Sequence, residues 1–196
     1  MNTARLEAFS DGVIAILITI MVLELHVPAG TDFAALRTVA PTFLSYVLSF
    51  MIIGIYWNSH HHLFQAARRV NGRILWANLH LLFWLSLIPF TSRWLGDNYT
   101  AAVPTAIYGV VLLLSGVAYV ILQARVIALD GRNSAIARAL ESDVKGKISV
   151  ALNVAAVALA FVRPWIAEML YAVGALIWFV PDPRIEHELS RERTAS

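Results

Sequence analysis

Long apolar stretches alternate with short polar segments along the whole chain. Several of these stretches reach the roughly 20 residues that cross a bilayer core of about 30 Å. Six helices are predicted, over residues of about 5–25, 41–64, 74–95, 104–127, 147–162 and 165–180. No separate soluble domain fits between them. The pattern therefore predicts an all-α, polytopic membrane protein with one six-helix transmembrane domain over residues 1–181.

Prolines mark several of the expected helix boundaries. Pro28 stops the first helix, while Pro41 and Pro104 suit the first turn of the second and fourth. Pro89 lies inside the third helix and is expected to kink it or to break its last turn, because proline removes a backbone donor.

The fifth and sixth helices are short for full spans. Only Arg163 and Pro164 separate them, which favours a tight helical hairpin, with a single re-entrant pair as the alternative. Residues 181–183 end the last helix, and residues 182–196 form a charged tail that is expected in the cytoplasm.

Composition agrees with a membrane environment. The 196 residues are 59% hydrophobic and only 14% charged, against about 25% charged residues in a typical soluble domain. The chain has no cysteine, which excludes disulfides. Its net charge of +2 is small and its basic residues are spread over loops, which argues against nucleic-acid binding.

The basic residues also predict an orientation. With six spans, both termini and the second and fourth connections share one side of the membrane. That side carries twelve basic residues: Arg5, Arg68, Arg69, Arg73, Arg125, Arg132, Arg138, Lys145, Lys147, Arg184, Arg191 and Arg193. The other side carries three: Arg37, Arg93 and Arg163. The positive-inside rule then places both termini in the cytoplasm, in a multi-pass protein of the cell membrane.

The first helix holds the most informative residues. A carboxylate near the start of a spanning helix, as at Asp11, is costly unless it is paired or hydrated. It also lies where a helix N-terminus favours negative charge. A structural anchor and direct contact with a transported ion both remain open for Asp11.

A narrow stripe on the same helix contains Ile16, Thr19, Ile20 and Leu23, and Asp11 lies about 140° round the axis from Ile16. If the stripe faced the axis of an assembly, Asp11 would point back into its own subunit. A ring of such residues would be a hydrophobic constriction with one hydroxyl layer. Ordinary helix packing, with Thr19 bonded to the carbonyl of Ala15, is the alternative. No internal repeat is visible, so a symmetric pore would need several chains.

The motif Arg5-x-x-x-Phe9-Ser10-Asp11, followed by a Gly-Val-Ile-Ala-Ile run, resembles the signature of the transmembrane protein 175 family of potassium channels. The resemblance covers the whole chain. It implies a homotetramer in membrane lipid, with helix 1 lining the pore and no Thr-Val-Gly-Tyr-Gly filter, which this sequence also lacks. It further implies K⁺, and Cs⁺ as a second candidate, as permeating ions without a resident cofactor or metal.

The family's constriction maps onto Ile16, Thr19 and Leu23, with Ile20 added from helical spacing, and K⁺ would pass transiently at the level of Thr19 and Ile16. The family's motif residues form a packing and hydrogen-bond network beside the pore helix. They correspond to Arg5, Phe9, Ser10 and Asp11.

Three adjacent histidines, His60, His61 and His62, end the second helix. They do not predict a metal site, because successive helical residues diverge by about 100° and helical metal pairs use i, i+4 spacing. A polar network that fixes helix 1 to helices 2 and 3 by hydrogen bonds to Ser10 and Asp11 is the favoured interpretation, with interfacial Trp and His as the alternative. Its candidate members are Trp57, His60 or His61, and Asn78 or His80.

Near the other end of the helices, Arg93, Trp94 and Asp97 are expected to form an interfacial anchor. Glu24 either attracts cations there or is a solvated helix end. The chain carries no hydrolase, metalloprotease or phosphate-loop motif, so an enzyme is not expected. A proton-coupled secondary transporter that uses Asp11 and the histidines is the alternative to a channel, although such carriers usually show internal repeats.

Overall fold

The computed structural model describes residues 3–67, 69–131 and 144–179, and every regular element in these ranges is helical. The elements are α1 (Thr3–Leu23), α2 (Phe33–Thr38), α3 (Ala40–Ala66), α4 (Gly72–Ser86), α5 (Ile88–Asp97), α6 (Ala102–Asp130), α8 (Val144–Ala160) and α9 (Pro164–Phe179).

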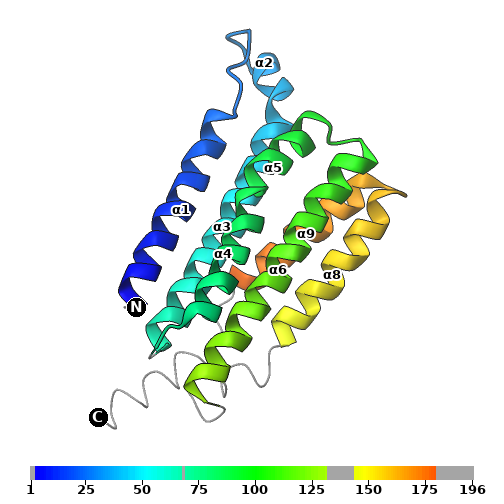
Figure 1. The fold of residues 1–196 in the computed structure, drawn as a ribbon. Helices are drawn as coiled ribbons and strands as arrows, with labels where there is room; N and C mark the ends of the chain where they lie inside the picture. The colour runs from blue at the N-terminus through cyan, green and yellow to red at the C-terminus, as the bar shows by residue number, and fades with distance from the viewer. Residues whose placement is uncertain (1–2, 68, 132–143, 180–196) are drawn as a thin grey trace.

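The long helices run side by side along one direction (Figure 1). Four stretches are long and apolar enough to cross a bilayer: Thr3–Leu23, Ala40–Ala66, Gly72–Asp97 and Ala102–Asp130. The shorter α8 and α9, of 17 and 16 residues, pack on each other as the predicted hairpin, and α8 also packs on α6. The prediction of an all-helical, multi-pass membrane protein is confirmed.

The third predicted helix is broken, as Pro89 indicated. It divides at Leu87 into α4 and α5, and Pro89 occupies the first turn of α5. The N–H of Leu87 still bonds to carbonyls of the last turn of α4. A proline cannot continue the preceding helix without a clash and a lost hydrogen bond, so the chain restarts there.

Several boundaries differ from the sequence prediction. The first helix ends at Leu23, two residues before the predicted Leu25. The short α2 was not predicted; the side chain of Asp32 caps it by accepting from the N–H of Ala35 over 2.8 Å. Pro104 is the third residue of α6 rather than its first. Residues 132–143 of the fourth connection and the predicted tail, 182–196, lie outside the described residues.

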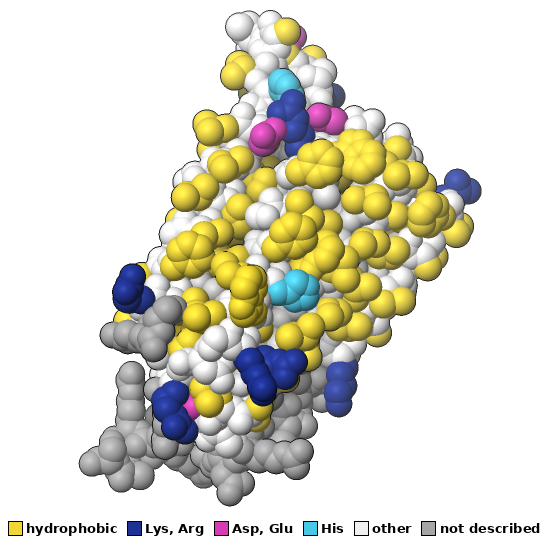
Figure 2. Space-filling view, in the orientation of Figure 1, with side chains coloured by type: hydrophobic (Ala, Val, Ile, Leu, Met, Phe, Trp, Pro, Cys, Tyr) yellow, Lys and Arg dark blue, Asp and Glu magenta, His cyan; other side chains and the backbone are white. Residues whose placement is uncertain are grey.

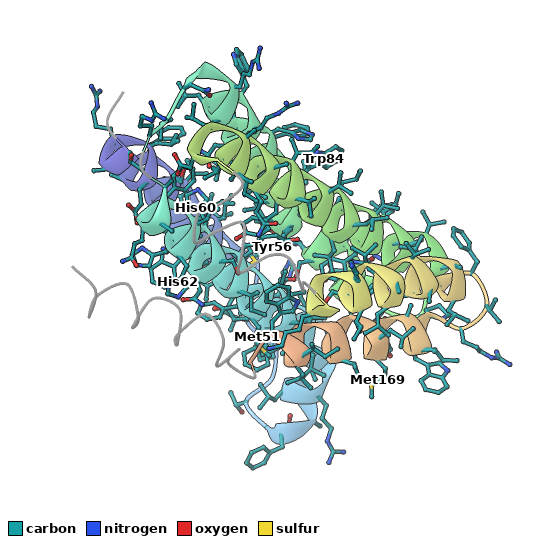
Figure 3. All side chains as sticks on the ribbon, turned by 90° about the horizontal axis from the view of Figure 1, so that it is seen from below. Met51, Tyr56, His60, His62, Trp84 and Met169 are labelled. Carbon is teal, nitrogen blue, oxygen red and sulfur yellow. The ribbon has the colours of Figure 1, made fainter. Side chains whose placement is uncertain are left out.

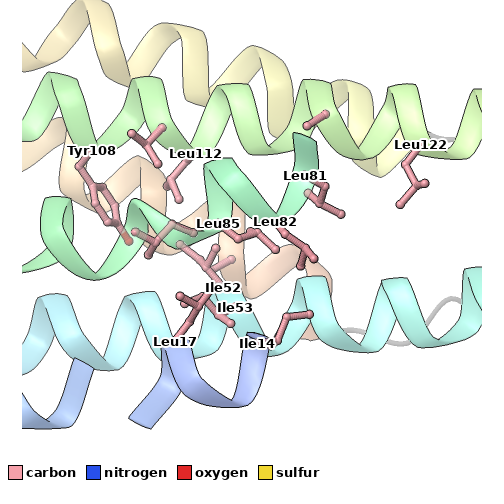
Figure 4. Packing of buried hydrophobic residues seen from close by; sticks show 14 of the residues in the cluster. Ile14, Leu17, Ile52, Ile53, Leu81, Leu82, Leu85, Tyr108, Leu112 and Leu122 are labelled. Carbon is pink, nitrogen blue, oxygen red and sulfur yellow. The ribbon is translucent and has the colours of Figure 1, made fainter. Parts of the chain in front are cut away.

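The core lies where α4 meets its neighbours. Helix α4 packs closely against α6 and also contacts α1, while α3 packs on α5 and α1. Figure 4 shows the meeting side chains: Ile14 and Leu17 of α1, Ile52 and Ile53 of α3, Leu81, Leu82 and Leu85 of α4, and Tyr108, Leu112 and Leu122 of α6. This packing fixes the rotation of α1 about its axis and so decides which of its faces stays uncovered.

The outside of the molecule is also apolar. Figure 2 shows hydrophobic side chains covering the middle of one face, with charged side chains gathered near its two ends. A wide apolar zone between two charged ends is what a bilayer requires of a spanning protein.

Candidate pore-lining face and the network behind it

Helix α1 has one buried and one exposed face. Its buried residues are Leu6, Ser10, Ile14, Leu17 and Met21, at spacings of three or four. The exposed face carries Phe9, Gly12, Ile16, Thr19, Ile20 and Leu23. Both sets are mostly apolar, so only packing distinguishes them.

The whole predicted stripe lies on the exposed face. Ile16 is 57% exposed and Leu23 is 80% exposed, and Thr19 and Ile20 are exposed between them. The hydroxyl of Thr19 donates to the carbonyl of Ile16 over 2.9 Å, not to that of Ala15. Because its proton is used within the helix, the Thr19 oxygen offers lone pairs outward, which is the arrangement that a cation needs.

A buried hydrogen-bonded chain holds the opposite face of α1. The hydroxyl of Ser10 donates to the carbonyl of Leu6 over 2.9 Å and accepts from Nδ2 of Asn78 over 2.9 Å. Oδ1 of Asn78 in turn accepts from Nε2 of His60 over 2.8 Å. Ser10, Asn78 and His60 are fully buried. They tie α1 to α4 and α4 to α3.

The direction of these bonds fixes the tautomer of His60. An amide oxygen only accepts, so Nε2 of His60 must carry the proton. Its Nδ1 is buried and has no partner among the described residues, and the ring packs on Phe64 with centroids 4.6 Å apart. His60 therefore serves as a neutral donor that positions Asn78.

A second, more exposed set of contacts joins α1 to α3. Nε1 of Trp57 donates to Asp11 over 3.0 Å. Nδ1 of His61 bonds to Glu7 over 2.8 Å while Nε2 of His61 accepts from Gln65, also over 2.8 Å. Since the Gln65 amide nitrogen can only donate, the proton of a neutral His61 sits on Nδ1 and points at Glu7.

The sequence analysis missed Glu7, although a signal was present. Glu7 and Asp11 are four residues apart and share one face of α1, and Trp57 and His61 are four apart on α3. The two pairs match across the interface, with the rings of Trp57 and His61 stacked 5.9 Å apart. Paired i, i+4 spacings on two helices are the pattern that could have revealed this contact.

Some predicted members of the network lie elsewhere. His80 is exposed and accepts a hydrogen bond from Nε1 of Trp84 over 2.9 Å, one turn along α4 and away from Ser10 and Asp11. Between the two α4 candidates, Asn78 is the one that reaches α1. Arg5 and Phe9 lie on the exposed side of α1 rather than in the buried chain.

The three adjacent histidines diverge, as their spacing requires. His60 points into the core, His61 towards Glu7, and His62 is exposed; Figure 3 shows His60 and His62 on different sides of α3. Within the described ranges, no group of three His, Cys, Asp or Glu side chains is placed to hold a metal.

An ion-pair cluster closes the other end of α1. Arg93 bonds to Glu24, donates to Nε2 of His26 over 2.9 Å, and lies 3.5 Å from Asp97. Asp97 also accepts from the hydroxyl of Thr42 over 3.2 Å. Glu24 is thus an ion-pair partner rather than a purely solvated helix end. The chain is therefore tied to α5 just after α1 ends, in addition to the contacts of α1 with α3 and α4.

The chain is similar in sequence and in fold to known proteins. The family described as endosomal/lysosomal potassium channel TMEM175 matches residues 5–89. A protein named potassium channel from Chryseobacterium sp. (strain P1-3) is 52% identical over 189 residues, covering 96% of this chain and 98% of that protein. The chain belongs to the TMEM175 family. The matched segment contains α1, α3 and α4, the three helices that the buried chain joins.

Other relatives of the TMEM175 family extend the comparison. The crystal structure of a lysosomal potassium-selective channel TMEM175 homolog from Chamaesiphon minutus superposes with a TM-score of 0.78 at 26% identity, covering 91% of this chain and 96% of that one. The human endosomal/lysosomal proton channel TMEM175 is 38% identical over 81 residues, which is 35% of this chain and 16% of the human protein.

Proposed function

We propose that this chain is a subunit of a potassium-selective channel, a homotetramer in which four copies of α1 line a pore. One observation carries the proposal: the described residues leave a continuous stripe of α1 uncovered, from Ile16 to Leu23, while the opposite face is locked by hydrogen bonds. The relatives named potassium channels support K⁺ as the permeating ion, since one of them aligns with nearly the full length of this chain.

Conduction through such a pore depends on partial dehydration. Rings of Ile16, Ile20 and Leu23 form a narrow apolar passage that water and ions enter reluctantly. Four Thr19 oxygens, each with its proton directed at Ile16, replace part of the water shell. K⁺ and Cs⁺ hold their water less tightly than Na⁺, so they pass more readily. The permeating ion needs no resident cofactor.

The proposal places the protein in the cell membrane with both termini in the cytoplasm. Arg69, Arg73 and Arg125 lie at the end of the bundle where α1 begins, and Arg37 and Arg93 lie at the opposite end. The larger basic end faces the cytoplasm under the positive-inside rule. Membrane lipid covers the apolar outer surface.

The alternative, a proton-coupled transporter, receives less support. It would need Asp11 and the α3 histidines as a relay, yet Asp11 is bonded to Trp57, and His60 lies in the buried chain behind the exposed stripe. These groups hold α1 in place. Because mammalian relatives are named proton channels, protons belong among the ions to be tested.

Flux into liposomes that contain only the purified protein tests the proposal. Gradients of K⁺, Cs⁺, Na⁺ and H⁺ are imposed in turn, and an ionophore sets the maximal response. Rapid K⁺ flux that exceeds Na⁺ flux is expected. Ile16→Asn should raise conduction and weaken selectivity, whereas Val120→Asn, at an exposed position of α6, should leave both unchanged. Slow, saturable, proton-coupled uptake would instead establish the transporter.

A further inference from the structure

The connection between α1 and α3 carries exposed apolar side chains at an unusual place. This outer arm, residues 27–38, includes α2 and extends beyond the ends of the long helices (Figure 1). Val27 is 91% exposed, Phe33 is 86% exposed and Leu36 is 56% exposed. Large apolar side chains that project this far from a fold indicate a surface that something covers.

The outer arm has a defined conformation, held by a helix cap and a close packing contact. Asp32 caps α2 through the N–H of Ala35, and Val39 carries the chain in helical conformation from α2 into α3. The segment before α2 folds back on it: a Cβ at Gly30 would lie 2.8 Å from Cβ of Ala35. Gly30 therefore permits a close approach that a larger residue would prevent.

The position of the arm argues against lipid as the cover. Arg93, Glu24 and Asp97 form the charged cluster where α1 and α5 end, which marks the water side of the bundle. Figure 2 shows hydrophobic side chains on the arm beyond this charged cluster. In an isolated subunit, Phe33 and Val27 would face water at that level.

The arm is also continuous with the face that we assign to the pore. Ile16, Ile20 and Leu23 are exposed at spacings of four and three residues along α1, and the chain then leads from the end of α1 to Val27, which is also exposed. If copies of α1 meet around one axis, the arms that follow them stand around the outer mouth. A second copy of the same arm is then the nearest apolar surface.

We propose that the outer arm packs against the arms of neighbouring copies and forms an apolar collar of Val27, Phe33 and Leu36 around the outer mouth of the pore. The proposal rests on the proposed tetramer and adds a contact outside the membrane. In a ring, each arm presents one surface to the preceding copy and another to the next, so the contact is heterologous and closes after four subunits.

Cysteine cross-linking tests the collar directly, because the chain has no native cysteine. In the double variant Phe33→Cys/Leu36→Cys, oxidation should link each subunit to two neighbours and give a ladder of two, three and four chains. The matched control is Tyr99→Cys/Val103→Cys, whose two positions are four residues apart and have exposed side chains at the same end of the molecule. It should stay monomeric on a denaturing gel.

Native mass spectrometry of the unmodified protein separates failure of the collar from failure of the channel assembly. A tetramer whose Phe33→Cys/Leu36→Cys form yields no ladder would overturn the collar and leave the channel proposal intact. A monomer would overturn both. If the double variant does not fold, Leu36→Cys with a short bismaleimide provides the same measurement, with cross-linked dimers as the expected product.

A second measurement tests lipid as the competing cover. A fluorescent bimane attached to Leu36→Cys should keep its emission when brominated phospholipids replace ordinary ones. Strong quenching would place the arm in the bilayer and overturn the collar.

Discussion

Replacement of Asn78 by leucine tests the buried chain behind the exposed stripe. Asn78 donates to Ser10 and accepts from His60, and all three residues are fully buried. In Asn78→Leu, Ser10 keeps its bond to the Leu6 carbonyl, but Nε2–H of His60 loses its acceptor. The main cost of this substitution is therefore one buried donor, the Nε2–H of His60, that is left without an acceptor.

The expected change in the free energy of unfolding follows from this one unpaired donor. A buried donor left without a partner costs about 1–3 kcal/mol, and single hydrogen bonds between membrane helices contribute about 0.6 kcal/mol on average. We expect Asn78→Leu to lower the free energy of unfolding by about 1–3 kcal/mol, which is roughly a fivefold to hundredfold change in the unfolding equilibrium. When both partners of the bond between His60 and Asn78 are replaced, neither is left unpaired. The double variant His60→Leu/Asn78→Leu should therefore lose less free energy of unfolding than the sum of the two single variants.

Reversible unfolding in mixed micelles, followed by tryptophan fluorescence, measures these free energies. Leu79→Ala is the control, because Leu79 is the exposed neighbour on the same helix. The reasoning is refuted if Asn78→Leu unfolds no more easily than Leu79→Ala, or if the double variant is fully additive. Either result would mean that the bonds among Ser10, Asn78 and His60 do not hold α1.

Three further changes test separate parts of the molecule. Thr19→Val removes the hydroxyl without changing side-chain size. The preference for K⁺ over Na⁺ should fall several-fold in reversal-potential measurements. An unchanged K⁺/Na⁺ permeability ratio would exclude a selective role for the Thr19 ring. Arg93→Gln leaves Glu24 without its cation. Because the pair is partly exposed, we expect little change in stability. The cation conductance should rise at low ionic strength and return to normal in high salt. Gly96→Ala would place a Cβ 2.6 Å from the Cα of Thr42 and should destabilise the protein by about 1–3 kcal/mol in the same unfolding assay. Gly54→Ala is the control: Gly54 has open space around it, so this variant should be as stable as the original protein or more stable.

Most of the fold could be predicted because its signals are local. Apolar length predicts a spanning helix from the bilayer thickness alone. Pro89 predicts a break because its ring and missing N–H act on the preceding turn of its own helix, and the chain divides at Leu87. The angular separation of Asp11 from Ile16 also follows from helix geometry, and the structure places Asp11 against Trp57 while Ile16 stays exposed.

The contacts between helices could not be predicted in this way. The sequence left open whether His60 or His61, and Asn78 or His80, approach helix 1; in the structure, Asn78 reaches Ser10, while His80 lies on the outside beside Trp84. The contact between Glu7 and His61 and the pairing of Glu24 with Arg93 were missed for the same reason. Each depends on how one helix is rotated and shifted against another.

The membrane is the physical reason why the helices could be predicted from the sequence but the contacts between them could not. In a soluble protein, a polar face shows which side of a helix meets water. In a membrane, neither lipid nor a hydrophobic pore constriction requires polar side chains, so both faces of α1 are mostly apolar. The sequence by itself determined the helices, their breaks and the angles within each. Tertiary packing decided which face of α1 is buried, because only a few polar contacts and the fit of side chains distinguish one rotation of the helix from another.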